Sequence, residues 1–186
     1  MLNKYGSLVR PFLNLVRWPN LLIVILTQCL VMFALIGRVY SGAGIEPALA
    51  PLLFFILVSV TVFIAAAGYI INDYFDLRTD RINKPKSVVI GRFFPRRIAI
   101  KLHIIFNSIA IAAGFYLSIK VGSFRLWLIF PLMTILLWFY SERYKRKVLS
   151  GNIAVAFMSA MVVIVVWLFE FFALRQQPGN FMTVYT

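Results

Sequence analysis

Three carboxylates stand close together in the sequence where a long apolar stretch ends. The apolar run 48–71 is followed by Asn72, Asp73, Asp76 and Asp80. If a helix continues past this run, its rotation of about 100° per residue places the four side chains within an arc of about 100°. Like charges on one helix face repel each other, and they do so more strongly beside a low-dielectric medium. A bound cation would remove that repulsion.

The acidic residues offer only oxygen ligands, which favour a hard metal ion. Mg²⁺ is typically held by one or two carboxylates and keeps other coordination positions for water and phosphate oxygens. The pattern therefore predicts a Mg²⁺ site at Asp73, Asp76 and Asp80. The next segment is basic and suits a phosphate group that the metal does not fully neutralise. Its cations are Lys84, Lys86, Arg92, Arg96 and Arg97.

A structural explanation of the same acidic residues is also open. Asp76 and Asp80 would then pair with basic neighbours on a solvated helix end. Those neighbours are Arg78, Arg81 and Lys84. The concentration of aspartates in one place favours the metal site, because the other strongly basic loop contains only Glu142 as an acidic residue.

The elements that position these residues are predicted to be membrane helices. The chain has 186 residues, of which 62% are hydrophobic and 13% charged, so it has too little polar surface for a soluble globule. Five apolar stretches approach the ~20 residues that a helix needs to cross a hydrocarbon core of ~30 Å. They are roughly residues 19–40, 48–71, 99–119, 124–141 and 151–174. Because lone strands cannot span lipid, we expect an all-α fold, a polytopic transmembrane helical bundle.

The net charge of +13 would suggest a nucleic-acid partner in a soluble protein. Here most of the 19 Lys and Arg residues lie in three places: before the first span, between the second and third spans, and between the fourth and fifth spans. The exceptions are Arg38, Lys120, Arg125 and Arg175. Under the positive-inside rule, this bias places the N-terminus and the aspartate-rich loop in the cytoplasm. We therefore expect the lipid bilayer as partner and no nucleic acid.

Few polar residues lie within the predicted spans. Gln28, His103 and Asn107 are too few and too scattered to indicate a transport pathway. We expect His103 and the single cysteine, Cys29, to be packing residues. Glu170, toward the far end of the fifth span, cannot supply a pair of carboxylates and is expected to be structural. Residues 1–18 are predicted to form an amphipathic lead-in before Pro19 starts the first span.

The pattern Asn-Asp-x-x-Asp-x-x-x-Asp runs from Asn72 to Asp80 and continues as Arg-Ile-Asn-Lys-Pro. It resembles the first aspartate-rich motif of the UbiA superfamily of intramembrane prenyltransferases. The stretch from Tyr140 to Asn152 is similar to the tyrosine and Lys-Arg turn between the fourth and fifth helices of that family. Trp18-Pro19-Asn20 resembles the family's opening. The continuation after Asp80 leans toward the branch resembling chlorophyll synthases and geranylgeranylglycerol-phosphate geranylgeranyltransferases.

The resemblance implies Mg²⁺-dependent transfer of a prenyl group from an isoprenoid diphosphate to a lipophilic or amphipathic acceptor. Asp73 and Asp76 would act through the metal, which Asp80 would also bind, and Tyr140 would stabilise the allylic cation. The residues implied in binding the diphosphate are Asn72, Arg92, Lys145 and Arg146. The protein would be a multi-pass protein of a bacterial or archaeal plasma membrane.

One departure from the family concerns length. The family has about nine spans and a second aspartate-rich motif, whereas five spans and no second motif are found here. We therefore expect residues 1–186 to form a single transmembrane domain, incomplete at its C-terminus, with 176–180 as a loop entering a further helix. An alternative function follows: an inactive truncated remnant or subunit that binds isoprenoid diphosphate or a partner chain. A C-terminal complementary chain is one such partner.

Overall fold

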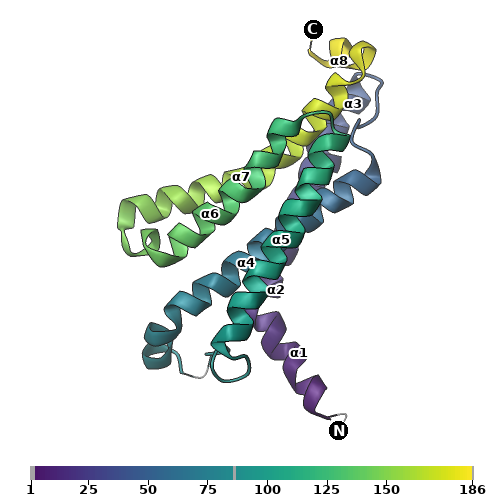
Figure 1. The fold of residues 1–186 in the computed structure, drawn as a ribbon. Helices are drawn as coiled ribbons and strands as arrows, with labels where there is room; N and C mark the ends of the chain where they lie inside the picture. Colours follow the sequence, from purple (N-terminus) through teal and green to yellow (C-terminus); the bar gives the residue numbers. More distant parts are fainter. Residues whose placement is uncertain (1–2, 86, 186) are drawn as a thin grey trace.

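The computed structural model describes residues 3–85 and 87–185 and shows an elongated bundle of helices (Figure 1). The α-helices are Asn3–Leu15 (α1), Trp18–Cys29 (α2), Gly37–Gly42 (α3), Pro51–Asn83 (α4), Arg96–Lys120 (α5), Ile129–Glu142 (α6), Val148–Arg175 (α7) and Pro178–Tyr185 (α8). Shorter segments are the π-helix Leu30–Ile36 (η1) and the 3-10 helices Phe124–Leu128 (η2) and Tyr144–Arg146 (η3).

Five helical segments have the length and hydropathy to cross a membrane, which confirms the predicted fold class. They are Trp18–Gly42, Pro51–Asn83, Arg96–Lys120, Phe124–Glu142 and Leu149–Arg175. Each overlaps one of the predicted apolar stretches. Two flanking helices also form as the sequence indicated: α1 is the lead-in, and α8 follows the loop after the fifth span.

The helix that carries the aspartates, α4, is longer than the apolar stretch that predicts it. It begins with Pro51, whose fixed φ suits the first turn of a helix, and it ends at Asn83, two residues before Pro85. Its 33 residues extend about 50 Å, whereas a hydrocarbon core is about 30 Å thick. The polar final turns of α4 therefore extend beyond the apolar part of the bundle. We call this end, with residues 84–95 and 143–147, the motif end.

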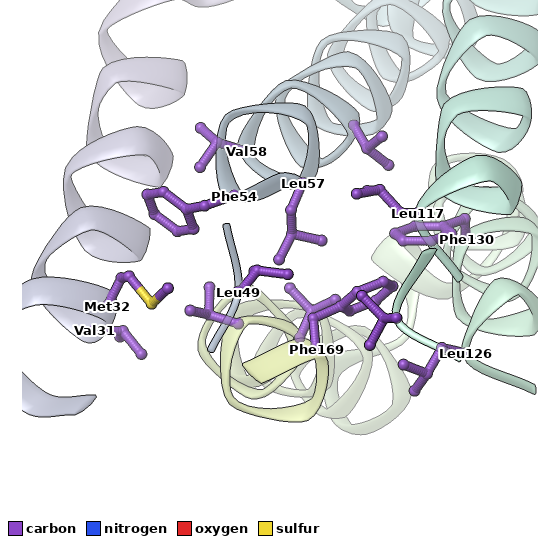
Figure 2. Packing of buried hydrophobic residues seen from close by; sticks show 14 of the residues in the cluster. Val31, Met32, Leu49, Phe54, Leu57, Val58, Leu117, Leu126, Phe130 and Phe169 are labelled. Atoms are coloured by element: carbon purple, nitrogen blue, oxygen red, sulfur yellow. The ribbon is translucent and has the colours of Figure 1, made fainter. Parts of the chain in front are cut away.

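The larger of two clusters of buried hydrophobic residues lies toward the opposite end of the bundle. Leu57 of α4, Leu117 of α5 and Phe169 of α7 are fully buried there, and Figure 2 shows them with Phe130 of α6 and Met32 of η1. In Figure 1, α6 and α7 diverge from α4 and α5 toward the motif end. A second, smaller buried cluster, which includes Leu15, Ile70 and Ile90, packs α1, α4 and the loop after α4 together at the motif end.

Close approach of α5 and α6 within this core depends on Gly114. A Cβ atom built on Gly114 would lie only 2.2 Å from Cδ2 of Phe130, so the ring occupies the space that any other side chain would need. We predict that Gly114→Ala lowers the free energy of unfolding by about 1–3 kcal/mol, because the ring or the helices must move. Thermal unfolding of the purified protein in detergent measures this. Gly42→Ala is the matched control, since its Cβ meets nothing within 4 Å. Equal melting temperatures for the two variants would contradict the packing argument.

Glu170 of α7 has the structural role expected of it and ties two distant parts of the chain together. Its carboxylate accepts hydrogen bonds from the backbone N–H groups of Ala48 (2.5 Å) and Leu49 (2.9 Å), just before α4. The residue is only 1% exposed, so water cannot replace this carboxylate as the partner of the two donors.

Replacement of this carboxylate by an amide should therefore destabilise the fold. Glu170→Gln keeps one acceptor oxygen and turns an N–H₂ donor toward the second N–H group, at an expected cost of about 1–3 kcal/mol in the free energy of unfolding. Chemical or thermal unfolding in detergent checks the value. Glu46→Gln, an exposed acid in the same connection, should leave stability unchanged. An effect of equal size at both positions would indicate a general charge effect in place of the two hydrogen bonds.

Candidate functional site

Two cavities lie toward the motif end. The first, the polar cavity, has a volume of about 920 Å³ and lies between α1, the start of α2, the last turns of α4 and the loop that follows. Its charged lining residues are Arg10, Arg17, Asp73, Asp76, Asp80, Lys84 and Arg92. Acids from α4 thus face cations from α1 and from the loop across one space, which is large enough to hold a phosphorylated group.

The second, the apolar cavity, has a volume of about 380 Å³ and lies between α2, α4, α6 and α7. Most of its lining is aliphatic, from residues such as Ile64, Met133 and Val162. Its polar lining includes Arg17, Asn72, Tyr140 and Ser141. Arg17 lines both cavities, so the two spaces adjoin at this side chain.

The geometry of α4 separates the aspartates from the asparagine before them. Asp73, Asp76 and Asp80 all line the polar cavity, so the prediction that they share one helix face is confirmed. Asn72, at the edge of the predicted arc, lines the apolar cavity instead. The boundary between the two cavities therefore follows the line between Asn72 and the carboxylates along α4.

Asp73 is paired with Arg17, which precedes α2. One guanidinium nitrogen lies 2.9 Å from Oδ1 of Asp73, and the same guanidinium stacks 5.1 Å from the centre of the Tyr69 ring. The backbone of Arg17 is left-handed, with φ 52° and ψ 56°. This conformation is uncommon outside glycine. It turns the chain between α1 and α2, and it places the Arg17 side chain over α4.

Asp76 is paired with Lys145 of η3, in the turn between α6 and α7. The ammonium nitrogen lies 2.5 Å from Oδ1 of Asp76, and it donates a hydrogen bond to Oδ1 of Asn72 at 3.3 Å. Gly151 allows this turn to fold tightly, because a Cβ there would lie 2.8 Å from the carbonyl oxygen of Tyr144. The predicted turn residue Lys145 therefore reaches the aspartate-rich motif from the opposite side to Arg17.

These two ion pairs are not the ones that a solvated helix end would form between the aspartates and their basic neighbours in the sequence. Within the described ranges, neither Asp76 nor Asp80 forms an ion pair with the basic residues that neighbour it on α4. The paired cations come from distant parts of the sequence. Arg17 lies 56 positions before Asp73, and Lys145 lies 69 positions after Asp76. The acids thus organise tertiary contacts across the motif end.

The remaining predicted site residues are distributed between the two cavities. Arg92 lines the polar cavity with the aspartates, and Tyr140 lines the apolar cavity with Asn72. The side chain of Arg146 lies outside the described part of the structure, as does Lys86. Arg96 stacks on the ring of Tyr74 at 5.5 Å. Its guanidinium therefore covers an aromatic ring on α4.

The donor chemistry of the three aspartates fits a Mg²⁺ ion. They supply hard oxygen ligands toward one cavity, and such an ion needs only one or two carboxylates with water and phosphate oxygens beside them. Among the described residues, no three His, Cys, Asp or Glu side chains gather closely enough to hold a metal by themselves. The residues therefore fit a shared site, completed by a phosphorylated ligand, better than a closed protein site.

His103 has the packing role expected of it, within a network that joins three helices. Its Nδ1 contacts the carbonyl oxygen of Ala67 on α4 at 3.0 Å, and Asn107 contacts its other ring nitrogen at 3.2 Å. Thr134 of α6 donates to Oδ1 of Asn107 at 3.0 Å. A donor on Nδ1 and an acceptor at Nε2 satisfy this network, which holds α5 against α4 and α6.

Comparison with known proteins decides the family. The UbiA prenyltransferase family matches residues 30–183, which is most of the chain. The chain belongs to the UbiA prenyltransferase family. The motif from Asn72 to Asp80 and the turn from Tyr140 to Asn152 both lie within the matched range.

Curated relatives of this UbiA family chain agree with the branch that the sequence favoured. It is 30% identical over 165 residues to the digeranylgeranylglyceryl phosphate synthase of Hyperthermus butylicus, covering 88% of this chain and 51% of the relative. The enzyme of the same name from Ignicoccus hospitalis is 32% identical, over 84% of this chain and 46% of the relative. That of Sulfolobus acidocaldarius is 40% identical over 110 residues, 59% of this chain and 38% of the relative.

The chain therefore spans about half the length of the UbiA family relatives that it matches. No solved structure matches it significantly.

The most informative site residue that the sequence did not single out is Arg17. It lies in the predicted amphipathic lead-in, yet it pairs with the first aspartate of the motif and lines both cavities. Its position just before Trp18-Pro19 marked a helix start and gave no sign of its partner. The left-handed turn that directs it toward α4 is a tertiary feature, which residue types alone do not show.

Proposed function

We propose that this chain provides the isoprenoid-diphosphate side of a prenyltransferase site, which transfers the prenyl group to a lipophilic or amphipathic acceptor. The observation that carries this proposal is the adjacency of the two cavities at Arg17. A prenyl diphosphate has a charged head and an apolar tail. The polar cavity suits the head, the apolar cavity suits the tail, and the reacting C–O bond would lie where they meet.

The residues of the motif end would then act in distinct ways. Asp73 and Asp76, with Asp80, would hold Mg²⁺, which when bound supplies charge neutralisation for the departing diphosphate. Arg92 would bind phosphate oxygens in the polar cavity, and Lys145, Asn72 and Arg146 would contact the head from the other side. Tyr140, in the apolar cavity, would present its ring to the positive charge that develops on the allylic carbon.

The acceptor belongs to the same proposal. The relatives are named for digeranylgeranylglyceryl phosphate, a lipid with prenyl chains on a glyceryl phosphate. We infer an acceptor of that class, a prenylated glycerol phosphate, whose hydroxyl oxygen attacks the allylic carbon. The bond between that oxygen and the carbon forms as the C–O bond to the diphosphate breaks, and the hydroxyl proton leaves for solvent.

The distribution of basic residues supports a cytoplasmic motif end. The positive-inside rule places the N-terminus and the loop after α4 on that side of the membrane. Isoprenoid diphosphates are highly charged and do not cross lipid unaided, so a site that opens to the cytoplasm can receive its substrate directly.

A second candidate function is a binding subunit without turnover. The chain spans about half the length of its relatives, and this observation favours it. In this function the two cavities bind isoprenoid diphosphate, and a complementary chain that contributes further helices completes the site.

The proposed role of the carboxylates predicts the effect of Asp76→Asn. The asparagine keeps the shape of the side chain but removes its charge, so Mg²⁺-dependent turnover of labelled geranylgeranyl diphosphate with a prenylated glycerol phosphate should fall at least about 100-fold. The purified chain is assayed alone and with a complementary chain. Glu142→Gln changes an acid at the end of α6 that lines neither cavity, and this variant should retain activity.

The outcomes of this assay separate the two functions. Turnover that is lost in Asp76→Asn and kept in Glu142→Gln supports the enzyme. Mg²⁺-dependent binding of the diphosphate with no turnover under either condition supports the binding subunit. No binding by the wild-type chain would exclude both.

The proposed place of the prenyl tail predicts the effect of filling the apolar cavity. Ala65→Phe adds a ring to a lining residue, so the affinity for geranylgeranyl diphosphate should fall about tenfold, while that for inorganic pyrophosphate should stay the same. Ala112→Phe, at an exposed position of α5, adds the same volume outside the cavity and serves as control. Equal affinity of the two variants for the prenyl ligand would place the tail elsewhere.

A further inference from the structure

Two of the three carboxylates expected to bind a metal are already paired with protein cations. Asp73 holds the guanidinium of Arg17 at 2.9 Å, and Asp76 holds the ammonium of Lys145 at 2.5 Å. In both pairs the carboxylate side chain is about one quarter exposed, at 24% and 26%. Lys145 is 14% exposed and Arg17 43%, so the pair of Asp76 with Lys145 is the better shielded from water.

A metal ion and these two cations compete for the negative charge of the same two carboxylates, each of which contacts its cation through Oδ1. Mg²⁺ that binds Asp73 or Asp76 through either oxygen neutralises the carboxylate and repels the nearby Arg17 or Lys145, which weakens the ion pair and favours release of the cation. The displaced cation then lacks an anionic partner at a partly buried position. Lys145 is only 14% exposed, so leaving it unpaired is costly.

Both cations have second contacts that would keep them at the site after displacement. The guanidinium of Arg17 lies on the Tyr69 ring at 5.1 Å, and Lys145 also donates to Asn72 at 3.3 Å. Neither contact uses an oxygen of the aspartates. A released Arg17 or Lys145 therefore stays beside the metal site, where a diphosphate bound to that metal would lie.

We propose that Arg17 is a diphosphate-binding residue, and that Arg17 and Lys145 exchange partners, from Asp73 and Asp76 to the diphosphate, when Mg²⁺ binds. This inference rests on the proposed function and deepens it. The exchange makes the metal and the diphosphate each strengthen the binding of the other, since the metal frees the cations that the diphosphate needs. Arg17 has the planar donor fork that suits phosphate oxygens.

Removing one of these cations should change the two affinities in opposite directions. Calorimetry on the purified full chain in detergent measures the affinity for Mg²⁺ alone, and then the affinity for inorganic pyrophosphate at saturating Mg²⁺. Arg17→Gln should bind Mg²⁺ about tenfold more tightly, because its competitor is gone, and pyrophosphate about tenfold more weakly. Lys145→Gln should do the same. Arg143→Gln, an exposed cation at the motif end that lines neither cavity, should change neither affinity.

A second pair of variants tests the exchange from the acidic side, without metal. In EDTA, Asp73→Asn frees Arg17 and should strengthen pyrophosphate binding. Asp80→Asn is the matched control, because it removes the same charge from the same cavity and, within residues 3–85 and 87–185, breaks no ion pair. The gain for Asp73→Asn should exceed the gain for Asp80→Asn by about fivefold or more.

The outcomes distinguish failure of this inference from failure of the proposed function. If Arg17→Gln and Lys145→Gln lower the affinity for both Mg²⁺ and pyrophosphate, or leave both affinities unchanged, the ion pairs are structural and the proposed exchange is wrong. Equal gains for Asp73→Asn and Asp80→Asn also overturn it, and this arm remains decisive if Arg17→Gln does not fold. A wild-type chain that does not bind pyrophosphate at saturating Mg²⁺ overturns the proposed function itself.

Discussion

The rest of the structure depends on one uninterrupted helix, α4. Its backbone groups must hydrogen-bond to one another within lipid, and its last turns must hold charged side chains outside the lipid. α4 has 33 residues, begins with Pro51 and is not broken before Asn83. Because lipid offers no hydrogen bonds to the backbone, a continuous helix is the economical way to bring residues 72–80 from the apolar bundle to its polar edge. All the other spans contact this helix or one of its neighbours, and the apolar cavity is built against its middle and the polar cavity against its last turns.

The larger hydrophobic cluster and the polar cavity occupy opposite ends of this helix. Near its start, aromatic and aliphatic side chains fill the bundle, and Gly114 lets α5 and α6 approach closely around Phe130. Near its end the helices diverge, and charged side chains bridge the gap between them. The smaller buried cluster that includes Leu15, Ile70 and Ile90 supports the motif end beside these ion pairs. This arrangement allows cavities to form in a small bundle without loss of the core that holds it together.

The sequence predicts some of these features well and others not at all. The five spans follow from local composition, because about 20 apolar residues in a row leave few alternatives to a membrane helix. The shared face of Asp73, Asp76 and Asp80 follows from helical rotation alone, and the structure confirms it. The sequence predicts the extension of α4 to Asn83 only in part, because the polar residues of its last turns are equally typical of a loop. The pairs of Asp73 with Arg17 and of Asp76 with Lys145 join positions far apart in the chain, and only the fold specifies such contacts.

The contact between Glu170 and the start of α4 also orders the assembly of the protein in time. The N–H groups of Ala48 and Leu49 and the carboxylate that accepts from them are 122 and 121 positions apart. During synthesis, which proceeds from the N-terminus, the second span leaves the ribosome well before the fifth. Those amides therefore remain at the membrane surface with water as their partner until α7 arrives, and only then can this end of the bundle close. The fifth span, which is made last, thus supplies the hydrogen-bond acceptor for the backbone just before the second span.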